Sequence, residues 1–518
     1  MTVKNPNLLA ALATLALVTL VITGTSAVAE DFTMGNANLE GSRSITDNDD
    51  FTKEKVSKHG LEVKWTAVTD GFVTHSAVTS GNKVMVGDIT GNMYAFDVAD
   101  GSLIWKTCIE TSCAVPAFPF AGIIGNPVVS GKNVYVGSLS GRLVALDIRT
   151  GDIVWTHTPL VNPLFFGLPL DSVWGGAIVV DDMIVYGLSP ADQFGLGVYA
   201  RGAVLAVNRR TGVEVWRSVL VSDADFASGS SGAGFWSSAP TYSAELGLIY
   251  VGTGQDRNPA PGAAGSDSIF AISASDGAIV WQTQVRTTDT WNLTLPFDPL
   301  QPTDTDFAQS PSVFKVKGQT MVAAGDKRGV FWVMDAQSGT ILNNGGSGLD
   351  MFDGSLPGPG LTGGFNIDAG FVKHGGDVRH FAVFSDQSAA LQDVVNMLPP
   401  WTNGVCFSSA NPQCPALPTG SVTVIAGDGS AEICRFSVPG TELFSPFHID
   451  GMILARGAQN GRLHVVDIDD CSSIDSFAVP TGPSGGASLS IADGLVFTGG
   501  GAFGAPGLVA IGVAKGDK

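Results

Sequence analysis

Alternating apolar and polar positions return along this chain in a fixed frame. A short apolar strand ends in a polar turn with a glycine, and a second strand with a tryptophan follows, as in residues 95–105. The turn supplies the positive φ that a hairpin needs, and the alternation on both sides gives each strand one buried face. The frame therefore predicts a β-hairpin, and it returns with Trp105, Trp155, Trp216 and Trp281.

Hairpins that recur at such intervals have to stack, because a single hairpin cannot bury its own apolar face. The four tryptophans follow one another at steps of 50, 61 and 65 residues, which is enough for four strands and their loops. A fifth copy has Asn343 in the tryptophan slot, and the next clear copy has Asp475 there, 132 residues further on. That interval is two blades wide, and it includes a degenerate blade with strands expected at 381–386 and 421–436.

The last repeat is short of one strand. Residues 487–497 and 507–513 leave its fourth strand missing, and residues 62–66 around Trp65 have the pattern of that strand. Pairing the two chain ends would close the ring and remove its exposed sheet edges. We therefore predict an all-β, eight-bladed β-propeller closed by an N-terminal strand, with seven blades as the main alternative.

The composition fits one exported all-β domain. Glycine accounts for 66 of 518 residues, proline for 27, and charged residues for only 15%. The apolar run 8–22 follows Lys4 and ends before a small-residue exit at 27–29, which is typical of a cleavable signal peptide. We expect a signal peptide at 1–29, an N-terminal arm at 30–59 and the propeller at 60–518. The mature protein should be periplasmic or secreted and lack a membrane span.

Charge and cysteine content narrow the partners further. A net charge of -20 argues against nucleic acid and polyanions; it suits a neutral or cationic partner, or it simply keeps an exported protein soluble. Six cysteines in an exported chain predict disulfides. The preferred pairs are Cys108 with Cys113 and Cys406 with Cys414, and Cys434 with Cys471 could link adjacent blades. The chain lacks Cys-x-x-Cys-His, so no attached c-type haem is expected.

The tryptophan frame resembles the docking repeat of the quinoprotein alcohol dehydrogenases. These are eight-bladed propellers that hold pyrroloquinoline quinone (PQQ) and usually Ca²⁺ near the central axis. The resemblance covers nearly the whole mature chain and is strongest to the polyvinyl-alcohol-dehydrogenase-like subgroup. It rests on an ordered series of site motifs at 235–241, 250–255, 289–292, 306–307 and 325–329.

The resemblance implies a set of cofactor-binding residues. Trp236 matches the tryptophan on which the quinone lies flat, although an ordinary packed tryptophan is the alternative. Lys327 matches the cation that faces the quinone carbonyls and would stabilise their charge on reduction, unless it is a solvated turn lysine. Ser189 begins the turn that ends at Asp192, and Asp192 and Gln255 match the Ca²⁺ ligands. Asp192 as a plain surface acid is the competing interpretation.

The catalytic position is the one where the chain departs most from the family. The family's Trp-Asp pair is Trp291-Asn292 here, and an amide cannot take the alcohol proton. The polyvinyl-alcohol-dehydrogenase-like subgroup tends to have this Asn together with an Asp two residues before the Trp, so the resemblance implies Asp289 as the base. Two functions follow. The first is a PQQ-dependent dehydrogenase that oxidises an alcohol or polyol and passes electrons to a separate acceptor such as a soluble cytochrome. The second, favoured by Gln255, Asn292 and the loss of the family's blade-two arginine, is a non-catalytic propeller for binding a polymer or protein.

Overall fold

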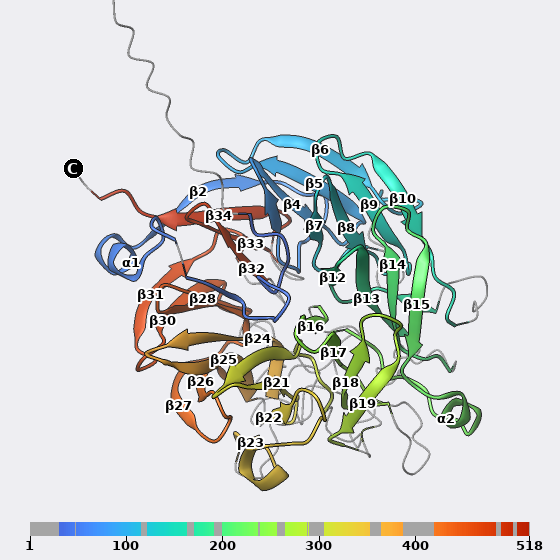
Figure 1. Ribbon diagram of the computed structural model, residues 1–518. Helices are drawn as coiled ribbons and strands as arrows, with labels where there is room; N and C mark the ends of the chain where they lie inside the picture. Colours follow the sequence, from blue (N-terminus) through green and yellow to red (C-terminus); the bar gives the residue numbers. More distant parts are fainter. Residues whose placement is uncertain are drawn as a thin grey trace, which may run out of the picture.

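Eight β-sheets stand in a ring around one axis (Figure 1). The computed structural model describes residues 31–46, 48–114, 122–162, 170–190, 199–236, 239–255, 265–286, 289, 305–352, 364–386, 419–482, 488–500 and 505–516. The signal peptide expected at 1–29 lies outside these residues. Among the helices that the structure describes, none is long and apolar enough to cross a membrane.

Each blade is an antiparallel sheet whose strands follow one another in the chain, except in blade 8. Blades 1 to 3 contain β3 (Val78–Ser80), β4 (Lys83–Gly87), β5 (Asn92–Asp97), β6 (Leu103–Cys108); β7 (Val128–Ser130), β8 (Asn133–Gly137), β9 (Leu143–Asp147), β10 (Ile153–His157); β12 (Ala177–Val180), β13 (Met183–Pro190), β14 (Ala203–Asn208), β15 (Glu214–Val219). Blades 4 to 6 contain β16 (Thr241–Ser243), β17 (Leu248–Gly252), β18 (Ser268–Ser273), β19 (Ile279–Gln284); β20 (Ser312–Val316), β21 (Gln319–Gly325), β22 (Val330–Asp335), β23 (Leu349–Asp350); β24 (Gly364–His374), β25 (Asp377–Asp386), β26 (Thr419–Ala426), β27 (Glu432–Pro439). Blades 7 and 8 contain β28 (Leu443–Ile449), β29 (Met452–Gly457), β30 (Arg462–Asp467), β31 (Ser473–Ala478); β32 (Leu489–Ala492), β33 (Leu495–Gly499), β34 (Leu508–Val513), β2 (Leu61–Ala67).

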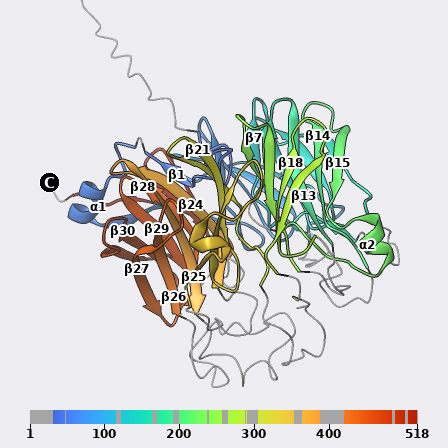
Figure 2. The same cartoon turned by 60° about the horizontal axis from the view of Figure 1, so that its bottom comes forward.

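Few elements lie outside this scheme. They are β1 (Ser44–Ile45), β11 (Asp171–Ser172), the helices α1 (Lys53–His59) and α2 (Asp223–Ala227), and the 3-10 turn η2 (Asn343–Gly346). The turned view in Figure 2 shows the sheets of neighbouring blades side by side, with α2 outside the ring.

Blade 8 joins the two ends of the propeller. Its outer strand β2 pairs antiparallel with β34, from Leu61 opposite Val513 to Ala67 opposite Leu508. The predicted eight blades and the closure by the Trp65 strand are confirmed, and the alternative of seven blades is wrong.

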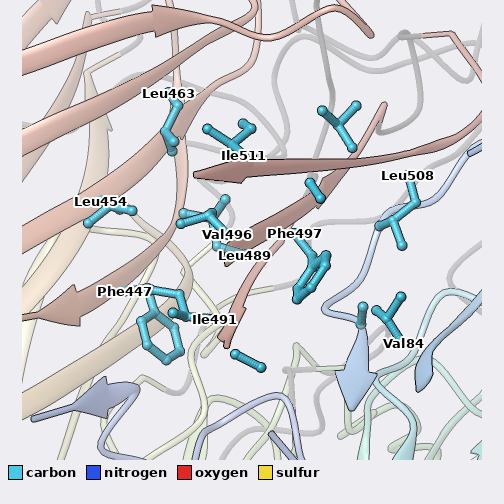
Figure 3. Packing of buried hydrophobic residues seen from close by; sticks show 14 of the residues in the cluster. Val84, Phe447, Leu454, Leu463, Leu489, Ile491, Val496, Phe497, Leu508 and Ile511 are labelled. Atoms are coloured by element: carbon cyan, nitrogen blue, oxygen red, sulfur yellow. The ribbon is translucent and has the colours of Figure 1, made fainter. Parts of the chain in front are cut away.

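The core lies between the blades rather than within them. Figure 3 shows one cluster, in which Phe447 and Leu454 of blade 7, Val496 and Phe497 of blade 8, and Val84 of blade 1 are all buried. Burying such a side chain contributes roughly 1.5–3 kcal/mol, so every blade depends on both neighbours. The closing blade is packed in the same way as the others.

The repeated tryptophan and glycine meet across blade boundaries. Trp65 Nε1 of blade 8 donates to Val98 O of blade 1 at 2.7 Å. A Cβ on Gly101, whose φ is 73°, would lie 2.6 Å from Cε3 of Trp65. The glycine therefore provides both the turn conformation and the space for the ring. We call this a docking pair, and it recurs as Trp105–Gly151, Trp155–Gly212, Trp216–Gly277 and Trp281–Gly339.

Other side chains replace the tryptophan at the remaining boundaries. Asn343 Nδ2 donates to Gly429 O at 3.0 Å between blades 5 and 6. Between blades 6 and 7 a disulfide takes the place of the docking pair: Cys434 lies opposite Val424 as Trp105 lies opposite Ala95, and it is bonded to Cys471. The predicted disulfides Cys108–Cys113 and Cys434–Cys471 are confirmed. Cys406 and Cys414 lie outside the described residues.

The N-terminal arm runs along the inner strands of the ring before the blades begin. Its carbonyl groups accept hydrogen bonds of 2.7–3.0 Å from the inner strands of blades 1, 2, 4, 5, 6 and 7 in that order. The donors are Thr79, Val129, Tyr242, Val313, Phe371 and His448. The guanidinium of Arg43, which is 1% exposed, also pairs with buried Asp368 of blade 6 at 3.0 Å. The arm thus ties six blades together from the inside.

Candidate functional site at the loop ends of blades 4 and 5

Lys327 lies in the turn between β21 and β22, at a position that the repeat buries. The corresponding turns of blades 1 and 2 carry Ile89 and Leu139, and both side chains are buried. The backbone follows the same scheme, because Lys327 N donates to Asp306 O at 3.0 Å as Ile89 N donates to Phe72 O at 3.1 Å. The Lys327 side chain is 2% exposed, so it is not a solvated turn lysine.

Three side chains form a compact group around the Lys327 ammonium, which we call the axial triad: Lys327, Asp306 and Trp236. Lys327 Nζ lies 2.8 Å from Asp306 Oδ1 and 4.2 Å from the centre of the Trp236 ring. Trp236 Nε1 donates to Asp306 Oδ2 at 2.8 Å. The carboxylate therefore holds the cation with one oxygen and the indole with the other. The contact between cation and ring is itself attractive, by about 0.5–2 kcal/mol.

Gly254 gives the triad its space. It lies in the turn after β17, in the register that Lys327 has in blade 5, and its N–H donates to Gly234 O at 2.9 Å. A Cβ on Gly254 would lie 3.1 Å from Asp306 Oδ2 and 3.2 Å from Trp236 Nε1. A side chain at this position would press directly on the hydrogen bond between the two residues.

Asp326, beside Lys327, shapes the turn. Its Oδ1 accepts from Val330 N and its Oδ2 from Trp332 Nε1, each at 2.9 Å. Burial raises the pKa of this carboxyl to about 6, although both hydrogen bonds and the charges of Arg286 and Arg328 act in the opposite direction. Because both oxygens are engaged within its own hairpin, Asp326 supports the position of Lys327 rather than extending the triad.

Asp289, the predicted base, is buried and bound to the segment that carries Asp306. Its Oδ2 accepts hydrogen bonds from both Thr305 N and Thr305 Oγ1, the latter at 2.8 Å. Thr305 immediately precedes Asp306, so the Asp289 carboxylate fixes the approach of the Asp306 side chain to the triad. The adjacent Trp291 and Asn292 lie outside the described residues.

The predicted metal ligands are only partly within the described residues. Ser189 lies at the end of β13, where its carbonyl accepts from Ser172 Oγ at 2.9 Å. Gln255 is 6% exposed. It follows Gly254, the turn residue that borders the triad. Asp192 falls outside the described residues. Within the part of the chain that the structure describes, no three His, Cys, Asp or Glu side chains come together as a metal site.

Asp306 has no predicted role in the site, although Asp306-Phe307 is one of the motifs of the family resemblance. The signal is in the repeat: Phe307 packs against Gly252, as Ile123 packs against Gly87 and Phe365 against Gly325. The residue before such a bulky side chain supplies the carbonyl that the next turn binds. The same spacing, applied to Phe307, places Asp306 beside the turn that contains Lys327.

Comparisons with known proteins agree with this architecture. Residues 172–344 match the family described as "Glucose/ethanol/alcohol dehydrogenase, beta-propeller domain", and residues 39–194 match the one described as "Outer membrane protein assembly factor BamB". No curated protein matches the chain in sequence.

Solved structures match over nearly the whole chain. A quinohemoprotein alcohol dehydrogenase from Comamonas testosteroni aligns with a TM-score of 0.69 and 18% identity, covering 94% of this chain and 82% of that one. A europium-containing methanol dehydrogenase gives 0.67 and 16%, covering 93% and 97%. BamB from Moraxella catarrhalis gives 0.50 and 14%, covering 88% and 99%. The chain has the fold of the PQQ-type β-propellers. Similarity to the polyvinyl-alcohol-dehydrogenase-like subgroup stays a prediction.

Proposed function

We propose that this protein is a PQQ-dependent dehydrogenase that oxidises an alcohol or another hydroxyl-bearing substrate and passes the electrons to a separate acceptor. The axial triad carries this proposal. Removing a lysine and a carboxylate from water costs several kcal/mol per ion, and the same turn in two other blades carries a plain aliphatic side chain. A charged group kept at such a position favours a chemical role.

The residues of the triad fit the needs of PQQ. A planar quinone needs a flat apolar surface and a cation near its oxygens, and Trp236 and Lys327 supply these. The ammonium lies over one face of the indole at 4.2 Å from its centre, so bound PQQ would stack on the opposite face or take the place of the ammonium, with the cation moving to the quinone oxygens. When bound, PQQ supplies a two-electron acceptor for the hydride of the alcohol.

The chain itself has to take the hydroxyl proton. Asp306 is the carboxylate of the triad, and its pairing with Lys327 at 2.8 Å keeps a compensating charge beside it. Asp289 stays the second candidate, because it contacts Thr305 beside the triad rather than the groups proposed to hold PQQ. We propose that Asp306 accepts the proton and that Asp289 positions the Thr305–Asp306 segment.

Calcium has no assigned step in this proposal. Gln255 follows Gly254 in the chain and has a side-chain oxygen, but the described residues do not form a metal site, and Asp192 lies outside them. Ca²⁺ therefore stays a prediction from the family resemblance.

The test is a PQQ titration followed by dye-linked alcohol oxidation. We expect the purified protein to perturb the PQQ absorbance saturably, and Trp236→Ala to weaken binding by roughly fivefold or more, because the stacking is worth on the order of 1 kcal/mol. Asp306→Asn should lower turnover by about 10²-fold or more while PQQ still binds. Asp276→Asn, at an exposed turn of blade 4, is the matched control and should behave as wild type.

The outcomes separate the candidates. A large loss in Asp289→Asn with none in Asp306→Asn would restore Asp289 as the base. Absence of a PQQ signal and of turnover across a panel of alcohols would instead favour a binding propeller. That second function is supported by the BamB family match at residues 39–194 and by the structural similarity to BamB.

A further inference from the structure

Six of the eight blades share a feature that blades 6 and 7 lack, because blade 6 has Val383 and blade 7 has Arg456 at the position concerned. In these six blades the second strand has a glycine opposite the first or second residue of the third strand. The glycines are Gly87, Gly137, Gly187, Gly252, Gly325 and Gly499. A Cβ on any of them would lie 2.1–2.8 Å from an atom of the next blade, so the boundary leaves no room for a side chain there. In blade 7 this register belongs to Arg456, which faces Leu463.

Arg456 extends toward blade 8 and is fully buried. Its Nη2 donates to Gly482 O at 2.8 Å and to Thr481 Oγ1 at 3.5 Å. Nε and Nη1 have no hydrogen-bond partner among the described residues. Burial lowers the pKa of the guanidinium to about 9, so the group stays charged at neutral pH.

Arg43, the other arginine that is fully buried among the described residues, shows which kind of partner Arg456 lacks. Arg43 is paired with the carboxylate of Asp368 at 3.0 Å and donates to two backbone carbonyls. In the part of the chain that the structure describes, Arg456 forms no ion pair with any carboxylate. A buried, unpaired charge costs several kcal/mol, and an oxyanion is the partner that satisfies a guanidinium best.

A second unpartnered donor belongs to the same hairpin. Gln459, three residues after Arg456, accepts from Glu442 N with its Oε1 at 2.7 Å. Its Nε2 is buried and has no acceptor among the described residues. The unsatisfied atoms of Arg456 and Gln459 are thus all N–H donors, which is the chemistry of an anion site rather than of a cation site.

We propose that Arg456 forms an anion-binding subsite at the boundary of blades 7 and 8, and that its ligand is a carboxylate or another small oxyanion. The subsite does not depend on the function proposed above. Its carboxylate can come from a free small acid or from PQQ, which is itself a tricarboxylate.

The experiment compares the two sources with the full chain. Thermal unfolding is followed with sodium formate at up to about 10 mM and constant ionic strength, since a ligand that binds only the folded state raises its stability in a saturable way. PQQ affinity is measured separately by absorbance. The variants are Arg456→Gly, which introduces the glycine found in six other blades, and Arg456→Met. Arg435→Met is the matched control, because that arginine already pairs with the Glu432 carboxylate at 2.6 Å on the outer strand of blade 6.

A saturable formate response that Arg456→Gly abolishes and Arg435→Met keeps supports a site for a free oxyanion. No formate response, together with a tenfold or larger loss of PQQ affinity in Arg456→Met only, supports the subsite with the cofactor as the source. An unchanged formate response in Arg456→Gly, or no effect of either probe, overturns the proposal. If Arg456→Gly does not fold, Arg456→Lys replaces it and should retain a weaker response. Failure of PQQ to bind at all leaves the formate arm decisive.

Discussion

The disulfide between Cys434 and Cys471 should stabilise the ring as the docking pairs do at other boundaries. It joins the outer strand of blade 6 to the turn of blade 7, where five of the other boundaries have a tryptophan against a glycine. Replacing both cysteines by serine removes the link and leaves that boundary with neither the bond nor an indole. Reduction of the wild type is less specific, because it also opens Cys108–Cys113.

The expected loss follows from the length of chain that each disulfide closes. A sequence separation of 37 residues corresponds to about 4 kcal/mol of loop-closure entropy, whereas the separation of 5 residues at Cys108–Cys113 corresponds to about 2 kcal/mol. The propeller spans roughly 460 residues, whose unfolding entropy is about 1 kcal/mol per kelvin. Cys434→Ser/Cys471→Ser should therefore lower the midpoint of thermal unfolding by about 4 °C.

Scanning calorimetry at one fixed heating rate is the assay, with Cys108→Ser/Cys113→Ser as the matched control at about half the effect. A third variant, Cys434→Trp/Cys471→Gly, rebuilds the docking pair and should recover part of the loss. The reasoning fails if the serine variant of the blade boundary melts with the wild type, or if the control loses more.

Two further perturbations test the buried charges. Burial lowers the pKa of His75 and of His380 to about 4, from 6.5 in the unfolded chain, so both side chains are neutral in the folded protein. As the pH falls from 6.5 to 4, each histidine should therefore lower the free energy of unfolding by an amount on the order of 3 kcal/mol. The raised pKa of Asp326 has the opposite effect on stability over this pH range. The midpoint of thermal unfolding should still fall with pH, and it should fall less steeply in His380→Gln. A midpoint that does not change with pH would contradict the expectation that the two histidines are neutral in the folded protein. Arg43→Met leaves Asp368 buried without its partner and should cost about 3–5 kcal/mol, whereas a denaturation midpoint equal to that of wild type would show that the arm does not depend on the pair.

The sequence predicted those parts of the fold that side-chain identity determines. Tryptophan and glycine recur because one ring packs on one turn, so Trp65 could be assigned to the closing strand before its partner was known. Cys434 and Cys471 could be paired as a link between blades, but their place in the docking slot depends on register, which only the strand pairing shows. The path of the arm could not be predicted, because backbone carbonyl groups form its contacts and every residue has one.

The candidate site shows the same division. Lys327 and Trp236 were named from the family resemblance, and the structure brings these two together in the axial triad. Asp306 was overlooked as a site residue, because its role depends on lying 2.8 Å from a lysine 21 residues later in the chain. Arg456 had no sequence signal until the strand register identified the glycine that it replaces.

The pairing of β2 with β34 sets an order of assembly. β2 is synthesised before any complete blade, but β34, the strand with which it pairs among the described residues, ends at Val513, so the first long strand of the propeller cannot pair until the last one is present. The contacts of the arm also depend on strands that are synthesised late, since its carbonyl groups accept hydrogen bonds from blade 7 as well as from blade 1. During synthesis the intermediate blades can stack in sequence, while both termini of the ring keep open edges that can pair with other chains. The risk of pairing with other chains therefore lasts until β34 is present to pair with β2.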